Sequence, residues 1–126
     1  MTIFEDFEEH FRNKNALPGI MICKDAFVDK AREAVCIYEY IGGQGPQQIS
    51  GVNRNFQFVS RSPSSKKAKE LAIAMYKAMQ TPDGILHINT ERWMTLQTRQ
   101  TPFKFKTDEN GLIYYAFNMA CITYLE

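Results

Sequence analysis

The chain of 126 residues has the length of one domain, and its hydrophobic fraction of 44% is enough for a packed core and too high for intrinsic disorder. No apolar run approaches the ~20 residues that cross a bilayer, and the acidic start Met1–Asp6 lacks the basic region of a signal peptide. The net charge is only +1, and we expect one cytosolic domain over residues 1–126 with no membrane association.

The first predicted element is a helix that starts at Thr2. Thr2-Ile3-Phe4-Glu5 fits a capping box, in which the hydroxyl and the carboxylate satisfy two free amides at the helix start. Apolar residues then recur on one face at helical spacing, namely Ile3, Phe4, Phe7 and Phe11. Leu17-Pro18-Gly19 is a turn signal that ends this unit.

Two strands are predicted next. Ile20–Cys23 is a short apolar run, whereas Ala26–Ala34 is ambiguous between a loop and one helical turn. Glu33–Ile41 alternates as a strand does, but both of its faces carry apolar side chains. It is therefore expected to be a central strand, or a strand with an interface on its second face.

A loop rich in glycine and glutamine, Gly42–Gly51, leads into the predicted strand Val52–Arg61. A long amphipathic helix follows, with Ser62 as the predicted N-cap and Pro63 as the first helical residue. The residues expected on its buried stripe are Ala68, Leu71, Ala72, Met75 and Met79.

The last third of the chain predicts the strands Ile85–Asn89, Met94–Phe105 and Leu112–Leu125, the second of which crosses Pro102, where an edge or a bulge is expected. Thr107-Asp108-Glu109-Asn110-Gly111 contains the Asn-Gly signal of a hairpin turn. The order of elements favours an α+β fold. In it, a mixed or antiparallel sheet carries the N-terminal helix and the long central helix on one face.

No residue set predicts catalysis, a cofactor or a metal site. Neither His10 nor His87 is placed with a cysteine and an orienting group, as a nucleophilic site requires. The chain has no CxxC, HxH or HxxxH pair for zinc, and the glycines after Ile41 lack the pattern of a phosphate-binding loop. The three cysteines lie in apolar or strand-like runs and are predicted to be inert buried thiols: Cys23, Cys36 and Cys121.

The charges are unevenly distributed along the chain. Residues 1–51 carry five Lys/Arg against eight Asp/Glu, residues 52–106 carry ten against three, and residues 107–126 carry none against three. These segments either neutralise one another across the fold or form two oppositely charged surfaces for docking. Phe56-Gln57-Phe58 and Phe103-Lys104-Phe105 are similar to the aromatic pairs of RNA-binding sheets, but core packing is the preferred interpretation of both.

Three segments together resemble the minor capsid and tail-terminator proteins of long-tailed bacteriophages. They are Tyr40-Ile41-Gly42-Gly43, the strand Asn55–Arg61, and the helix Ala68–Tyr76 with its spaced alanines and Met-Tyr pair. The similarity in layout spans most of the chain. It implies a structural protein that forms a ring, usually a hexamer, on the head-proximal end of the tail tube.

In that role the protein would stop tail polymerisation and help to join the tail to the head, without catalysis. The implied partners are other copies of the chain, the tail-tube protein and the head–tail connector proteins. The implied location is the virion, after assembly in the bacterial cytoplasm. The residues predicted to contact a neighbouring subunit or the tube are Gly42, Gly43, Gln44, Gln47, Gln48, Arg54 and Arg61. Arg61→Glu is expected to weaken assembly and to leave the monomer folded.

Other functions stay open from the sequence. One is a head-completion or stopper protein at the neck, which differs from a terminator in where it sits in the virion. Another is a small sheet that binds single-stranded nucleic acid without sequence specificity, favoured by the basic central segment and the phenylalanine pairs. An enzyme of unknown kind is the third.

Overall fold

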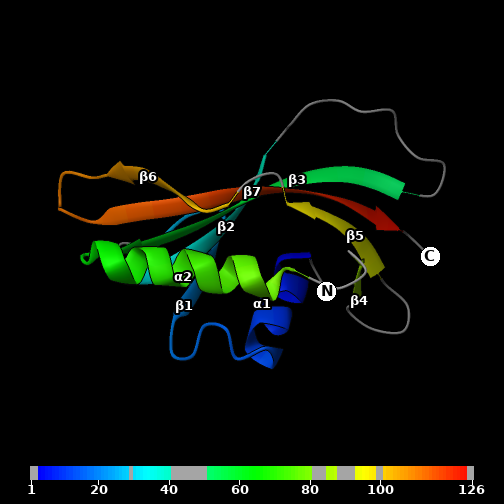
Figure 1. Ribbon diagram of the computed structural model, residues 1–126, viewed down its shortest axis with the longest axis horizontal. Coiled ribbons are helices and arrows are strands. Elements are labelled where there is room, and N and C mark those ends of the chain that lie inside the picture. Colours follow the sequence, from blue (N-terminus) through cyan, green and yellow to red (C-terminus); the bar gives the residue numbers. More distant parts are fainter. Residues whose placement is uncertain are drawn as a thin grey trace.

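A computed structural model gives the fold of residues 3–28, 30–40, 51–80, 85–87, 93–98 and 101–124. Within these ranges, two helices and seven strands follow one another along the chain (Figure 1). They are α1 (Ile3–Asn13), β1 (Met21–Lys24), β2 (Ala34–Tyr40), β3 (Gly51–Ser62), α2 (Ser65–Ala78), β4 (Ile85–His87), β5 (Trp93–Thr98), β6 (Phe103–Thr107) and β7 (Ile113–Tyr124). The predicted α+β class is confirmed.

The described strands form one mixed sheet, as predicted. Their order is β1-β2-β3-β7-β5-β4, and β6 also pairs with β7. β1 and β2 run parallel, whereas every other described pair is antiparallel. The two longest strands, β3 and β7, are paired from Gly51 with Tyr124 to Ser62 with Ile113 and form the centre of the sheet.

The strand predicted over Met94–Phe105 is wrong in one respect, because the structure has two strands there. β5 ends at Thr98, and β6 begins at Phe103, directly after Pro102. Proline has no N–H to give to a sheet ladder, so it stands outside both strands. β5 and β6 then lie along the same edge of β7, β5 beside its second half and β6 beside its first half.

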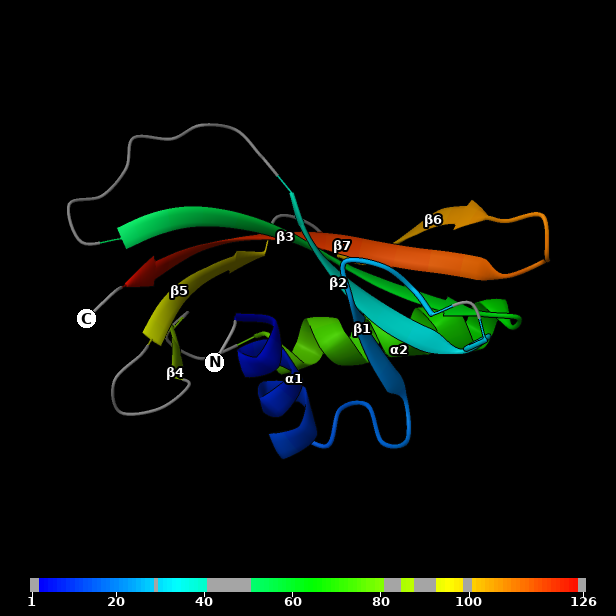
Figure 2. The same cartoon turned by 180° about the vertical axis from the view of Figure 1, so that it is seen from behind.

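Both helices cover the same face of the sheet, as predicted (Figures 1 and 2). Phe7 and Phe11 of α1 point onto β3. There Phe7 lies edge-on to Phe56 at 5.0 Å and to Phe58 at 5.3 Å between ring centroids. Phe58 stacks on Phe117 of β7 at 5.0 Å. All five rings are fully buried. Because each buried phenylalanine stabilises a fold by about 1.5–3 kcal/mol, this cluster anchors α1 to the sheet.

Helix α2 has the predicted buried stripe but a different start. Ala68, Leu71, Ala72, Met75 and Met79 are all buried. The N-cap, however, is Ser64, whose Oγ accepts a hydrogen bond from the Lys67 amide at 3.3 Å.

Ser62, the predicted cap, is instead the last residue of β3. Its hydroxyl donates to Glu33 Oε2 at 3.0 Å and accepts from the Ser64 amide at 3.1 Å. The strand ladder thus continues through Ser62, which delays the helix by two residues.

The turn between β6 and β7 is the predicted hairpin. Gly111 has φ +79°, a left-handed conformation that glycine adopts without steric cost. The Asp108 carboxylate accepts from the amides of Asn110 and Leu112, each at 2.9 Å, and from the Tyr114 hydroxyl at 3.0 Å. These bonds to the ionised form hold the pKa of Asp108 below its usual value.

Candidate functional site

The face of the sheet opposite α1 and α2, called the second face below, is partly covered by a loop among the described residues. β1 and β2 are parallel neighbours, so the chain has to cross over between them. Asp25, at φ +65°, turns the chain out of β1. Phe27 then packs over the second face, edge-on to Tyr38 of β2 at 6.4 Å and to Tyr114 of β7 at 5.7 Å between ring centroids. This crossover segment, described for residues 25–28 and 30–33, thus covers part of the second face.

Arg61 fixes this crossover segment to β3. Its Nε donates to the Ala31 carbonyl at 2.9 Å, and one terminal nitrogen bonds the carbonyls of Val28 and Ala31. The guanidinium carbon lies 4.3 Å from the centroid of the Phe27 ring, a cation–π contact. Arg61 is only 6% exposed. The side chain is therefore used inside the subunit, where it holds a segment that belongs to no helix or strand.

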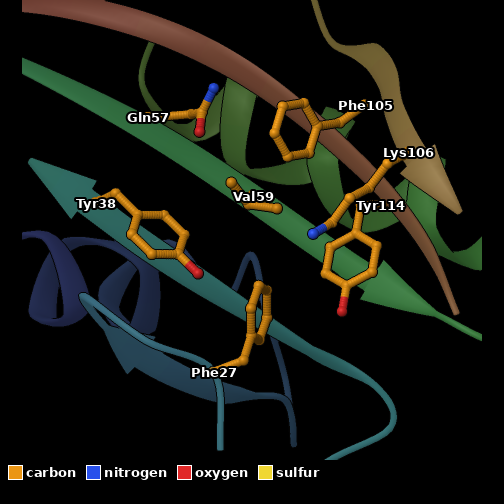
Figure 3. A pocket seen from close by; sticks show the side chains of 7 residues that line it. All are labelled: Phe27, Tyr38, Gln57, Val59, Phe105, Lys106 and Tyr114. Atoms are coloured by element: carbon orange, nitrogen blue, oxygen red, sulfur yellow. The ribbon is translucent and has the colours of Figure 1, made fainter. Parts of the chain in front are cut away.

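Between the crossover segment and β6 lies an open cavity of about 250 Å³, called the aromatic groove below. Figure 3 shows that its side chains come from the crossover segment, β2, β3, β6 and β7. Its lining residues are Phe27, Tyr38, Gln57, Val59, Phe105, Lys106 and Tyr114. An apolar concave surface with a few polar groups is typical of a binding site.

The β6 wall of the groove is both apolar and basic. Phe105 is 46% exposed, which is unusual for a phenylalanine. Lys106 Nζ lies 4.8 Å from the Tyr114 ring centroid and 5.8 Å from that of Phe105. The groove thus offers aromatic surface with one cation at its rim, which suits an apolar group that has a carboxylate beside it.

The predicted site residue Arg54 lies elsewhere. Its guanidinium forms two hydrogen bonds with the Glu39 carboxylate, both at 2.6 Å, and its carbon lies 5.5 Å from the centroid of Phe56. The carboxylate raises the pKa of Arg54 further above its ordinary value. Phe56 belongs to the core under the helices, and Arg54, two residues before it on the strand, shares that face. Arg61 is an odd number of residues from Phe56 and therefore lies on the second face. The structure does not bring the two predicted arginines together.

The other predicted site residues, Gly42, Gly43, Gln44, Gln47 and Gln48, lie outside the described residues. Phe56 and Phe58 are core residues, as expected. The same expectation is wrong for Phe105, which is exposed because β6 is an edge strand and the bulge between Lys104 and Lys106 displaces it from regular pairing.

Sequence reasoning missed Phe27 altogether, since it lies in the segment that was ambiguous. The only sequence signal for a site on the second face was the prediction that both faces of Glu33–Ile41 are apolar. The structure confirms this prediction, because Val35 and Ile37 pack under the helices and Cys36 and Tyr38 lie on the second face.

The sequence model of the bacteriophage tail terminator protein family matches residues 14–125. That range holds most of the chain, including every described strand. The chain belongs to the bacteriophage tail terminator family. No curated protein matches it in sequence. As a member of this family it is a structural component of the phage tail, and the predicted resemblance is confirmed.

The described part of this tail terminator holds no cluster of three or more metal-ligating side chains. Burial raises the pKa of the Cys36 thiol to about 11 and that of Cys121 to about 12, so both stay protonated at neutral pH. Burial also raises the pKa of the Tyr38 hydroxyl at the groove. None of the described helices is long and apolar enough to cross a membrane.

Proposed function

We propose that this tail terminator acts without catalysis. It forms a ring of six subunits on the head-proximal end of the tail tube. There it stops tube polymerisation and presents a surface for the head–tail connector. The observation that carries the proposal is the family match over residues 14–125. Its partners would be other copies of the chain, the tail-tube protein and the connector proteins.

The second face supports a role in assembly. Among the residues that the structure describes, helices cover one face of the sheet and the crossover segment covers part of the other. The aromatic groove and the exposed rings of Phe105 and Tyr40, which are 46% and 39% exposed, remain there. A chain of 126 residues has little need of such surface as a monomer, and exposed aromatic surface is typical of protein interfaces.

The oligomeric state tests the proposal. The molar mass of the purified protein is measured by light scattering, alone and with tail-tube protein. Particles of six times the 14.6 kDa subunit, in either condition, are the expected result. A strict monomer in both conditions would rule out the ring.

Electron microscopy of virions with a tagged copy tests the location. Label at the head-proximal end of the tube is expected. Label at the neck, separate from the tube end, would instead identify a stopper protein.

A further inference from the structure

Three strands of the sheet each have a single partner among the strands that the structure describes: β1 pairs only with β2, β4 only with β5, and β6 only with β7. β4 is only three residues long, so β1 and β6 are the two longer edges. Strands at an edge present unpaired N–H and C=O groups to which another chain can add. β1 and β6 are short and similar in length, at four and five residues.

The two edges lie at opposite ends of one row of residues. The row consists of directly paired residues on neighbouring strands, from β1 through β2, β3 and β7 to β6. In this order they are Met21, Ala34, Arg61, Tyr114 and Lys106. A β1 strand from a second copy, placed beside β6, would therefore extend this row by one more residue.

Each edge also carries one exposed apolar side chain on the second face. Met21 is 47% exposed, and it shares the face of its partner Ala34, which packs with Phe27 on the second face. Phe105 is 46% exposed and lines the aromatic groove on that face. If β6 of one copy met β1 of another, these two side chains would come to the same face of a continuous sheet and shield each other from water.

Charge favours the pairing of unlike edges over the pairing of like ones. β6 carries Lys104 and Lys106, both exposed. An ion pair joins β1 to the acidic helix α1, with Lys24 Nζ 2.9 Å from Glu8 Oε1, and Glu9 of α1 is exposed. Two β6 edges would place lysines against lysines. A β6 edge beside β1 and α1 places lysines near carboxylates instead.

From these observations we propose that β6 of one subunit pairs edge to edge with β1 of a second copy of this chain. Met21 of the second copy then lies beside Phe105 at the mouth of the aromatic groove. The contact joins two different surfaces, so it is heterologous and can close into a ring. The inference rests on the proposed ring and names the surfaces that build it.

Single substitutions with a matched control test the two edges. Met21→Asp and Phe105→Asp each place a carboxylate at one edge. Val28→Asp is the control, because Val28 is also 47% exposed but belongs to neither edge strand, and its carbonyl is bonded by Arg61 of β3. By light scattering, Met21→Asp and Phe105→Asp should be monomers and Val28→Asp should assemble like the wild type. Circular dichroism melting curves report whether each variant is folded.

Mixing the two edge variants gives the decisive result. Met21→Asp keeps an intact β6 edge, and Phe105→Asp keeps an intact β1 edge. In an equal mixture these two edges pair, and no further subunit can add because the remaining two edges carry the substitutions. The expected mass is twice that of the subunit, 14.6 kDa. Monomers in the mixture, from two variants that are folded, would overturn the pairing.

The ring and the pairing can fail separately. If the wild type and both edge variants all form the same ring, the pairing is wrong and the ring stands. If the wild type is a monomer with and without tail-tube protein, the proposed ring is wrong and the pairing falls with it.

Discussion

The guanidinium carbon of Arg61 lies 4.3 Å from the ring centroid of Phe27. This contact joins the end of β3 to the crossover segment between β1 and β2. The same group bonds the carbonyls of Val28 and Ala31. This arrangement orders Phe27, which is one wall of the aromatic groove. The groove therefore depends on a buried arginine that does not line it.

Arg61→Met should lower the free energy of unfolding by on the order of 3 kcal/mol, because hydrogen bonds from a buried charged donor are lost and two carbonyls lose their partner. Arg54→Met is the matched control. Its ion pair with Glu39 is partly exposed, with side-chain exposures of 31% and 32%, and should cost less than about 1 kcal/mol. Urea unfolding followed by circular dichroism measures both. Equal losses for the two variants would contradict the structural role of Arg61.

The burial of Arg61 changes the expectation for Arg61→Glu. That variant was expected to weaken assembly and to leave the monomer folded. A carboxylate at a site that is 6% exposed and surrounded by backbone carbonyls is repelled by them. Loss of assembly in that variant would therefore reflect loss of folding. Whether Arg61 also contacts a neighbour stays a prediction.

Much of the fold was predictable because its signals are local. The period of the apolar residues predicted α1, α2 and β3, and the Asn-Gly pair predicted the β6–β7 turn. The role of Arg61 was not predictable, since an arginine at the end of a strand is ordinarily a surface residue. Its partners Val28 and Ala31 are about 30 residues earlier in the chain and have no periodicity. The aromatic groove likewise depends on the crossover, which only the parallel pairing of β1 with β2 creates.

Ser64→Ala should lower the stability of the protein by about 1 kcal/mol, because Ser64 is the N-cap of α2 and its Oγ accepts from the Lys67 amide. Ser65→Ala is the control. Ser65 is the first helical residue and is exposed, so its loss should leave stability nearly unchanged. Thermal denaturation compares the two variants. A larger loss of stability for Ser65→Ala than for Ser64→Ala would mean that Ser64 is not the N-cap of α2.

Acid should destabilise the protein through His10. A carbonyl can only accept, so His10 Nε2 donates to the Ala78 carbonyl, at 2.7 Å, near the end of α2. Burial, the largest cause, lowers the pKa of His10 below its ordinary 6.5. The unfolded chain therefore takes up a proton before the folded one does. Stability from this site is complete above about pH 6.5 and falls as the pH drops through the lowered value.

The variant His10→Gln tests this dependence, because glutamine does not titrate. The free energy of unfolding of both proteins is measured by urea denaturation between pH 5 and 7.5. The wild type should lose more stability than His10→Gln on acidification. A difference between the two proteins that is the same at every pH would show that His10 does not titrate differently on folding.

The cysteines should be inert in the folded protein. Cys23, Cys36 and Cys121 are free and buried, and burial raises the thiol pKa of Cys36 to about 11 and of Cys121 to about 12. The thiolate is the reactive form, so a thiol reagent at pH 8 should label almost none of Cys36 and Cys121, and burial should shield Cys23 from the reagent. In denaturant all three should react, as counted by mass spectrometry. Rapid labelling of Cys121 in the native protein would mean that β7 opens readily.

Lys104→Glu should weaken assembly more than Lys69→Glu, although each changes the net charge by the same amount. Lys104 lies on the exposed edge strand β6, where a neighbour's acidic α1 is proposed to approach, whereas Lys69 is exposed on α2. Exposed charges are screened over about 10 Å at 0.1 M salt, so raising the salt should narrow the difference. Analytical ultracentrifugation over a concentration series measures the association of each variant. Equal weakening by both substitutions would mean that net charge, and no contact at β6, controls assembly.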